Sequence, residues 1–194
     1  ARGAAEFERE LVKVSQVTGT SLKNLAGIRQ EISSLATTLG VSSKALIETT
    51  RILAQTGISA RETRQALDAL AKTTLAPTFS DIKNTTETAI AAMKQFRLET
   101  KDLSRVLGEI NAVAGQFAVE ASDIGVAIRR TGGVFQAAGG QLKELEALFT
   151  SVRSTTRESA ETIATGFRTI FTRIQRPRTI KFLRQLGIEL TDLQ

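Results

Sequence analysis

Short stretches such as LAQTGISARE, Leu53–Glu62, decide the fold, because in them an apolar helical run meets a glycine, an aliphatic residue and a serine. Glycine, here Gly57, adopts without strain the left-handed backbone conformation that ends many helices. Ser59 can accept hydrogen bonds from the free N–H groups of a following helix, and Glu62 stands three residues later, as in a capping box. The stretch therefore predicts a tight turn between two helices.

The same arrangement occurs earlier, in TLGVSSKAL, where Gly40 and Ser42 take the places of the glycine and the serine. Near the end of the chain, Gly187 followed by an isoleucine repeats the glycine–aliphatic stop. We assign Gly166 to the same group of turn residues. None of these residues carries chemistry, and we interpret them as architecture alone.

Between the turns, apolar residues recur at helical spacing, and no long alternating run indicates a strand. We expect Gln116–Ala121 to be an irregular connector and Gly132-Gly133 to interrupt a helix. The polar residues Thr49, Thr50, Thr85 and Thr86 are expected to face solvent or another chain.

The predicted helices cover about 4–17, 21–39, the segment between Gly40 and Gly57, 60–74, 82–96 after a cap at Ser80 or Asp81, 100–115, 122–131 with a further turn at 134–138, 142–152, a helix starting from a capping box at Thr155–Glu158, and 179–186.

The sequence thus predicts an all-α fold, an irregular multi-helix bundle of short helices joined by Gly-aliphatic-Ser turns. A regular solenoid is less favoured because the helical units vary from seventeen to more than twenty residues. As one unbroken helix the chain would reach roughly 290 Å, which the repeated glycines oppose. We therefore expect a compact globule with a radius of gyration near 16 Å.

Several kinds of chemistry are excluded by composition, because the 194 residues include no Cys, His, Tyr or Trp. A zinc site, a thiol nucleophile and a Ser-His triad all need residues that the chain lacks. Only a carboxylate pair or a Ser/Lys arrangement would remain for catalysis, and no pattern indicates either. We expect no catalytic, cofactor-binding or metal-binding residues, and no apolar run reaches the length of a membrane-spanning helix.

The positive charge of the chain is concentrated near its end. Eight Lys and Arg residues and two Glu residues lie between Arg153 and Arg184, a net charge of +6 that equals the charge of the whole chain. One interpretation is contact with a polyanion or an acidic partner, and the other is a solvated face opposite an apolar stripe. The candidate contact residues are Arg168, Arg173, Arg176, Arg178, Lys181 and Arg184.

Four segments resemble, in the same order, the core region of phage tail tape measure proteins. They are VSSKALIETTRILAQTGISARETRQALDAL, FRLETKDLSRVLGEINAVAG, TGGVFQAAGGQLKELEALFTSV and ATGFRTIFTRIQRP, the last followed by a Phe-Leu-x-x-Leu-Gly-Ile tail at Phe182–Ile188. The resemblance extends over about Leu25–Leu190. It divides the chain into an N-terminal helix at 1–20, continuing from an upstream segment, and a core region at 21–194, and we expect the chain to be an excerpt of a longer one.

The resemblance implies a structural protein of the virion that acts in tail length determination, tail assembly and genome ejection. Its implied partners are the tail tube protein, baseplate hub proteins, tail assembly chaperones and copies of itself. Nonspecific DNA contact is a separate alternative that rests on the basic residues between Arg153 and Arg184. The implied location is the tail lumen or baseplate of the virion, and the host cytoplasm during assembly. It implies no cofactor and no enzymatic activity in this region.

Two other classes stay open at this point. A helical interaction or signalling module would share the richness in Ala, Ser, Thr and Glu, but it would need uninterrupted heptads over many turns. A basic nucleic-acid-contacting helical domain would rest on residues 153–184 alone.

Overall fold

The computed structural model describes residues 2–19, 21–23, 25–79 and 81–188, and within them the chain consists of helices joined by turns. The elements are α1 (Arg2–Thr18), α2 (Ala26–Leu39), α3 (Ser43–Ala54), α4 (Ala60–Thr73), α5 (Ile82–Phe96), the 3-10 helix η1 (Thr100–Asp102), α6 (Leu103–Gln116), α7 (Ala121–Ala137), α8 (Leu142–Thr156), α9 (Ala160–Ile174) and α10 (Pro177–Gln185).

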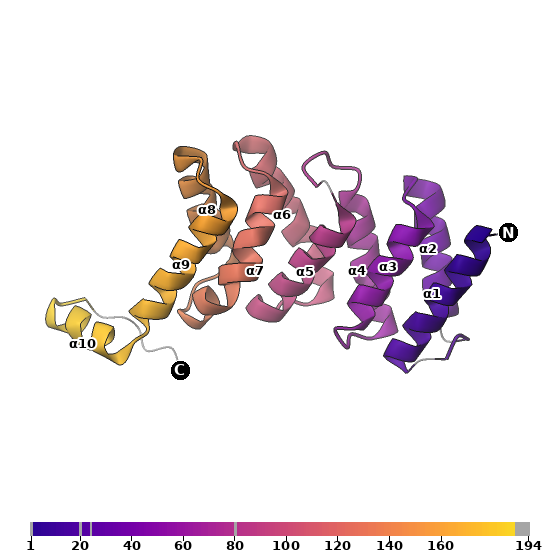
Figure 1. Cartoon of the computed structure of the whole chain (residues 1–194), viewed down its shortest axis with the longest axis horizontal. Coiled ribbons are helices and arrows are strands. Elements are labelled where there is room, and N and C mark those ends of the chain that lie inside the picture. Colours follow the sequence, from indigo (N-terminus) through magenta and orange to yellow (C-terminus); the bar gives the residue numbers. More distant parts are fainter. Residues whose placement is uncertain (1, 20, 24, 80, 189–194) are drawn as a thin grey trace.

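The helices form two layers that run side by side along the molecule (Figure 1). Each odd-numbered helix from α1 to α7 packs against the next odd-numbered one, and α4 packs between α2 and α6. From α2 onward, successive helices also contact each other across the layers. Each helix thus contacts mainly the helices that are one and two places away along the chain. This pattern is typical of stacked helix pairs, whereas in a bundle the helices pack around one common centre.

The prediction of an all-α multi-helix fold is confirmed, but the expected compact shape is wrong. The helix pairs stack in a row that is longer than it is wide, and α10 extends it at one end (Figure 1). The chain exposes 11172 Å², whereas a compact monomer of this mass exposes roughly 9,000 Å². Helices α1 to α9 have 12 to 17 residues, so they are similar enough in length to stack, even though the segments that connect them vary in length.

A continuous apolar core lies between the layers, in three neighbouring clusters. The first joins α1 to α4 and contains Val14 and Leu46, the second joins α3 to α6 and contains Leu70, and the third joins α5 to α9 and contains Ile128 and Phe149. All five side chains are fully buried, and burial of side chains of this size contributes about 1.5 to 3 kcal/mol each. Each helix pair is therefore stabilised by its neighbours, and no single centre holds the fold.

The turns have the conformations that the glycines predict. Gly40 follows α2 with φ 69°, Gly57 follows α3 with φ 80°, and Gly187 follows α10 with φ 76°, all in the left-handed region. Ser59 caps α4, because its Oγ accepts from the Glu62 N–H at 3.2 Å while a Glu62 carboxylate oxygen accepts from the Ser59 N–H at 2.8 Å. Ser42 occupies the equivalent position before α3, but its side chain makes no capping hydrogen bond.

Gly166 and the Gly132-Gly133 pair were expected to mark turns or interruptions, and this was wrong. Gly166 lies inside α9, and α7 continues through both glycines to Ala137. Gly132 is buried against α5, where a Cβ would stand 2.8 Å from Cε2 of Phe96. Close packing of α5 on α7 therefore accounts for Gly132, whereas nothing in the structure explains Gly166.

Two predicted helix starts were also wrong. Helix α2 begins at Ala26 instead of near Ser21, because residues 22, 23 and 25 lie in turns, and Leu25 is buried in the core. Helix α8 continues to Thr156, and Arg157 ends it with φ 59°. The cap of α9 is then Ser159, whose Oγ accepts from the Thr162 N–H at 3.1 Å.

The four threonines expected at the surface are buried. Their hydroxyl groups need no solvent when they donate to a carbonyl oxygen one turn earlier in the same helix. Thr50 donates to Leu46 O at 2.8 Å, Thr85 to Asp81 O at 2.8 Å, and Thr86 to Ile82 O at 2.7 Å. Threonine therefore serves as a core residue in this chain.

Candidate interaction surfaces

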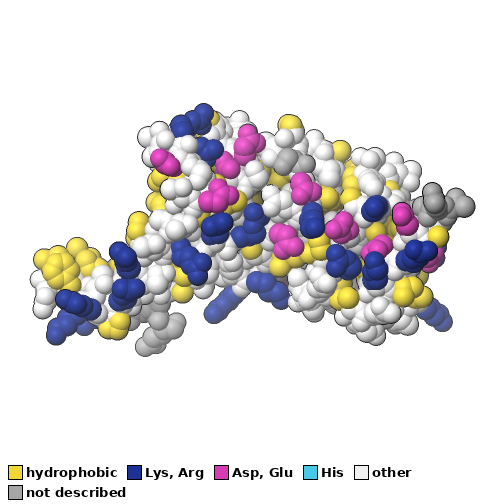
Figure 2. Space-filling view, viewed as in Figure 1, with side chains coloured by type: hydrophobic (Ala, Val, Ile, Leu, Met, Phe, Trp, Pro, Cys, Tyr) yellow, Lys and Arg dark blue, Asp and Glu magenta, His cyan; other side chains and the backbone are white. Residues whose placement is uncertain are grey.

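The six predicted contact residues gather at the α9–α10 end of the row. Arg168 and Arg173 lie on α9, Arg176 is the N-cap of α10, and Arg178, Lys181 and Arg184 lie on α10. All six are exposed. None of them forms an ion pair within the described part of the chain. On the face shown in Figure 2, Lys and Arg side chains gather at this end, while Asp and Glu lie over the other helices.

The aromatic residues of α9 hold the helix to α7. Phe171 packs edge-on against Phe135 with ring centroids 4.7 Å apart, and Phe167 packs against Phe171 at 6.0 Å. Gln175 donates from Nε2 to Val134 O at 3.0 Å, which joins the end of α9 to α7. The two rings of α9 are therefore half-buried against α7 and do not act as stacking platforms for bases, whereas Phe182 of α10 is exposed between Lys181 and Arg184.

Helix α10 is attached much less firmly than α9. It packs on α9, and none of its described residues is buried. Phe182 is 58% exposed and Leu186 is 60% exposed, so the helix presents apolar as well as basic side chains to solvent. In Figure 1 it projects from the end of the row.

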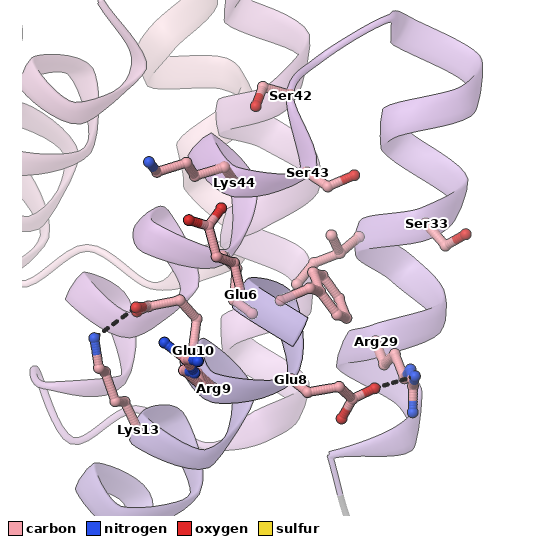
Figure 3. Close-up of a pocket in the computed structure, with 13 residues that line it drawn as sticks. Glu6, Glu8, Arg9, Glu10, Lys13, Arg29, Ser33, Ser42, Ser43 and Lys44 are labelled. Carbon is pink, nitrogen blue, oxygen red and sulfur yellow. Dashed lines mark hydrogen bonds and ion pairs between the residues drawn. The ribbon is translucent and has the colours of Figure 1, made fainter. Parts of the chain in front are cut away.

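A cleft of about 690 Å³ lies at the opposite end, between α1, α2 and the start of α3. Figure 3 shows Glu8 of α1 directed at Arg29 of α2, with which it forms an ion pair, and Glu10 paired with Lys13 at 2.6 Å. Ser42 lines this cleft beside the first residues of α3. Its acidic and basic side chains alternate and pair, so the cleft has no marked preference for either charge.

A second groove, of about 550 Å³, lies between α6 and α8. These two helices make few contacts with each other, although α7 and α9 pack closely in the other layer. The apolar part of the groove is formed by Ala112, Val113, Phe117 and Ala147. Phe117 is 50% exposed, so the groove is open to solvent and one of its apolar residues is an exposed aromatic.

Two buried polar side chains lie in the wall of this groove. Glu146 is 4% exposed and Thr150 is 5% exposed, and they follow each other by one turn on α8. Glu146 Oε1 and Thr150 Oγ1 have no hydrogen-bond partner within the described residues. Burial raises the pKa of Glu146 to about 7, and the negative charge of Glu109 adds to this effect.

Glu109 and Lys143 form the charged rim of the groove. Glu109 accepts from Lys143 Nζ at 3.0 Å and from Arg105 Nη1 at 3.1 Å. Although burial opposes it, these hydrogen bonds and the two nearby cations hold the pKa of Glu109 below its usual value. Lys143 is therefore engaged with Glu109, and Glu146 forms no ion pair with a cation of the described residues, although Lys143 and Arg105 lie near enough to lower its pKa slightly.

The basic end was predicted from the sequence, whereas the α6–α8 groove was not. A signal was present, because Glu146 stands four residues after Leu142 and three before Phe149, which places a carboxylate on the apolar face of its helix. The structure does not bring the turn residues together into any site: Gly40 follows α2, Gly57 and Ser59 share the turn between α3 and α4, and Gly187 follows α10.

The described residues include no group of three or more acidic side chains that could hold a metal ion. Nor does any helix in these residues combine the length and the apolar character that crossing a bilayer requires. The surfaces that distinguish this molecule are thus the basic end, the N-terminal cleft and the α6–α8 groove.

Comparison with known proteins gives one family match. The family is described as phage-related minor tail protein, and its model matches residues 29–194. No solved structure matches the chain. The matched region contains most of α2 and every later helix, including the basic end and the α6–α8 groove. The chain therefore belongs to the family of phage-related minor tail proteins.

Proposed function

We propose that the chain is the core segment of a phage tail tape measure protein, acting in tail length determination, tail assembly and genome ejection. The observation that carries this proposal is the ordered series of four segments that resemble the tape measure core, all of which fall within the helical row. Membership in a family of phage tail proteins supports the tail as its site of action.

Within the tape measure, we assign this segment to docking and not to measuring length. A ruler works by its extended length, and an extended helix gains 1.5 Å per residue. The row instead folds back at each turn and buries an apolar core between its layers. Straightening the chain would expose side chains such as Phe149 and Ile128, which are fully buried, at a cost of about 1.5 to 3 kcal/mol each.

The proposed partners are the tail tube protein, the baseplate hub proteins, the tail assembly chaperones and copies of the chain itself. The exposed basic end and the open α6–α8 groove are the surfaces available for them. The proposed location is the tail lumen or baseplate of the virion, after assembly in the host cytoplasm. No enzymatic role is part of this proposal.

An in-frame deletion in the phage tests both parts of this proposal, that the chain belongs to a tape measure protein and that its role there is docking. We expect that a tape measure lacking residues 26–188 yields few or no complete tails, seen by negative-stain electron microscopy, because docking is lost. Tails shortened by about 240 Å would support a tape measure but contradict the docking role, since that is the length of an extended helix of this size. Full-length tails on fully infectious virions would contradict the whole proposal.

Nonspecific contact with DNA is a second candidate, favoured by one observation. Between residues 162 and 188 the chain has six basic residues and no acidic one, and the six are exposed. If they bind phosphates, the affinity for duplex DNA should fall steeply with salt, and R173E/R176E should reduce the slope of log K against log salt by about 2. No binding at physiological salt would discard this candidate.

A further inference from the structure

The α6–α8 groove contains hydrogen-bonding groups that the chain itself does not satisfy. Other buried threonines donate to the carbonyl oxygen one turn earlier, as Thr50 and Thr86 do. Thr150 has no such bond, although Glu146 supplies the carbonyl at that spacing. Buried polar atoms without partners are rare in folded proteins, and each one needs a physical explanation. Two such atoms line this groove.

The side chains of the groove indicate which kind of ligand would bind in it and satisfy its buried polar atoms. Glu146 offers a carboxylate in an apolar setting, where a cation that donates hydrogen bonds is the strongest partner. Ala112, Val113, Phe117 and Ala147 provide apolar walls that would contact the aliphatic stem of a lysine or arginine and the helix that carries it. Because Lys143 is held by Glu109 at 3.0 Å, it does not supply that cation. The fitting ligand is a helix with both basic and apolar side chains.

Helix α10 has these properties. It carries Arg178, Lys181 and Arg184, none of which has an ion-pair partner within the described residues, and it exposes Phe182 and Leu186. Among its described residues none is buried. It therefore offers both a cation for Glu146 and apolar side chains that match the apolar walls of the groove.

We propose that the groove between α6 and α8 is the docking site for α10 of a second copy of the chain, with Glu146 accepting a hydrogen bond from Lys181 or Arg184 of that helix. Docking occurs between copies because α10 packs on α9 at the end of the row and lies well apart from α6 and α8 (Figure 1). The raised pKa of Glu146 agrees with a carboxylate whose counter-ion comes from another molecule.

The two surfaces of this contact are different parts of the molecule. A contact of this kind is heterologous, and repeated from copy to copy it builds a ring or an open filament, whereas a contact between two identical surfaces ends at a dimer. This property gives the proposal a specific test on the purified chain, which succeeds or fails independently of the tail-length experiment.

The first test uses two variants that each lose one surface. E146Q removes the negative charge of the acceptor with little change of shape, and K181E/R184E removes the donor at exposed positions that leave the core intact. In sedimentation velocity experiments, we expect the wild-type chain to form species larger than a dimer. Each variant alone should associate at least about tenfold more weakly, because a charge-assisted hydrogen bond is lost. E158Q, on the exposed turn after α8, is the matched control and should associate like the wild type.

Mixing the two variants distinguishes this contact from nonspecific association. E146Q still carries an intact α10, and K181E/R184E still carries an intact groove. An equimolar mixture should therefore form heterodimers that stop at two chains. A wild-type chain that stays monomeric, variants that associate as strongly as the wild type, or a mixture without heterodimers would each overturn the proposal.

A cysteine cross-link locates the contact directly, because the chain has no native cysteine. S151C places one thiol in the groove, and F182C in a second sample places one on α10. A disulfide between them requires Cα atoms within about 7 Å. We expect rapid cross-linking of S151C with F182C and none of T38C, an exposed position on α2, with F182C. Equal yields for both pairs would overturn the assigned site.

Discussion

Gly132 and Gly133 are adjacent in α7, yet only one of them touches another helix. A Cβ on Gly132 would meet the side chains of Gln95 and Phe96 of α5, whereas a Cβ on Gly133 would meet nothing within 4 Å. Gly125, two turns earlier, likewise faces Thr88 of α5. The absence of side chains at 125 and 132 therefore lets α5 and α7 approach closely, and Gly133 only lowers the helix propensity.

This difference predicts opposite effects of two alanine substitutions. G133A should stabilise the fold by about 0.5 to 1 kcal/mol, because alanine replaces glycine in a helix interior without a clash. G132A should destabilise it by about 1 kcal/mol or more, because the cost of forcing a methyl group into packed surroundings exceeds the gain in helix propensity. Urea unfolding followed by circular dichroism measures both values. Equal shifts for the two variants would show that α5 and α7 are not in close contact at Gly132.

Glu146 makes the stability of the isolated chain depend on pH. Burial raises its pKa from 4.5 to about 7 in the folded state. Between these values the folded state keeps a proton that the unfolded state has lost, so stability falls as the pH rises. The proton is present in the folded state at pH 5 and is lost above pH 7, which leaves a buried charge.

We therefore expect E146Q to match the wild-type stability at about pH 5 and to exceed it by roughly 2 to 3 kcal/mol at pH 8. Thermal and urea unfolding across this pH range give the comparison at low protein concentration, where copies do not associate. E158Q should leave the pH profile of the wild type unchanged. A gain for E146Q that does not vary with pH would mean that the effect comes from packing and not from the charge.

At the scale of helices, the two serine caps provide a matched pair. Ser59 forms both hydrogen bonds of a capping box with Glu62, and Ser42 occupies the same position before α3 without a capping bond. S59A should cost about 1 kcal/mol of stability, whereas S42A should change it by less than about 0.5 kcal/mol. Urea unfolding of the two variants at pH 7 tests this. Similar losses for both would show that Ser42 caps α3 in solution.

The existence of most helices could be predicted from the sequence, because glycines with positive φ and serine or aspartate caps act locally. The continuity of α7 could not be predicted, since what keeps Gly132 in a helix is the neighbouring α5, which is 36 residues away at Phe96. The burial of Thr85 and Thr86 was missed for a related reason. Their hydroxyl groups bond within their own helix, so their polarity does not indicate which side of the helix faces solvent.

The candidate surfaces could be predicted in part. The residues of the basic end lie close together in the sequence, and charged side chains are expected at the surface. The location and the exposure of these residues could therefore be predicted. The α6–α8 groove depends on how far two helices of the same layer separate, and that distance is set by the packing of α7 and α9 in the other layer. Only the position of Glu146 on an apolar helix face pointed to it.

At the scale of the whole molecule, local signals predict turns but not how successive helices are arranged around them. The same Gly-aliphatic-Ser turn can lead into a bundle or into a stacked row, and unequal unit lengths favoured the bundle. The row results because α3, α5 and α7 each bury surface against helices on both sides in their own layer. Such a row has two open ends, and one of them carries the basic helix α10 (Figures 1 and 2).

The central claim is that this phage tail segment is a folded row of helix pairs, neither a globule nor an extended ruler. Small-angle X-ray scattering of the K181E/R184E variant, in which copies stay apart, tests it most directly. We predict a radius of gyration clearly above the 16 Å of a compact domain of this length, with a maximum dimension far below the roughly 290 Å of one continuous helix. A radius of gyration of about 16 Å, or a maximum dimension that approaches 290 Å, would contradict the account.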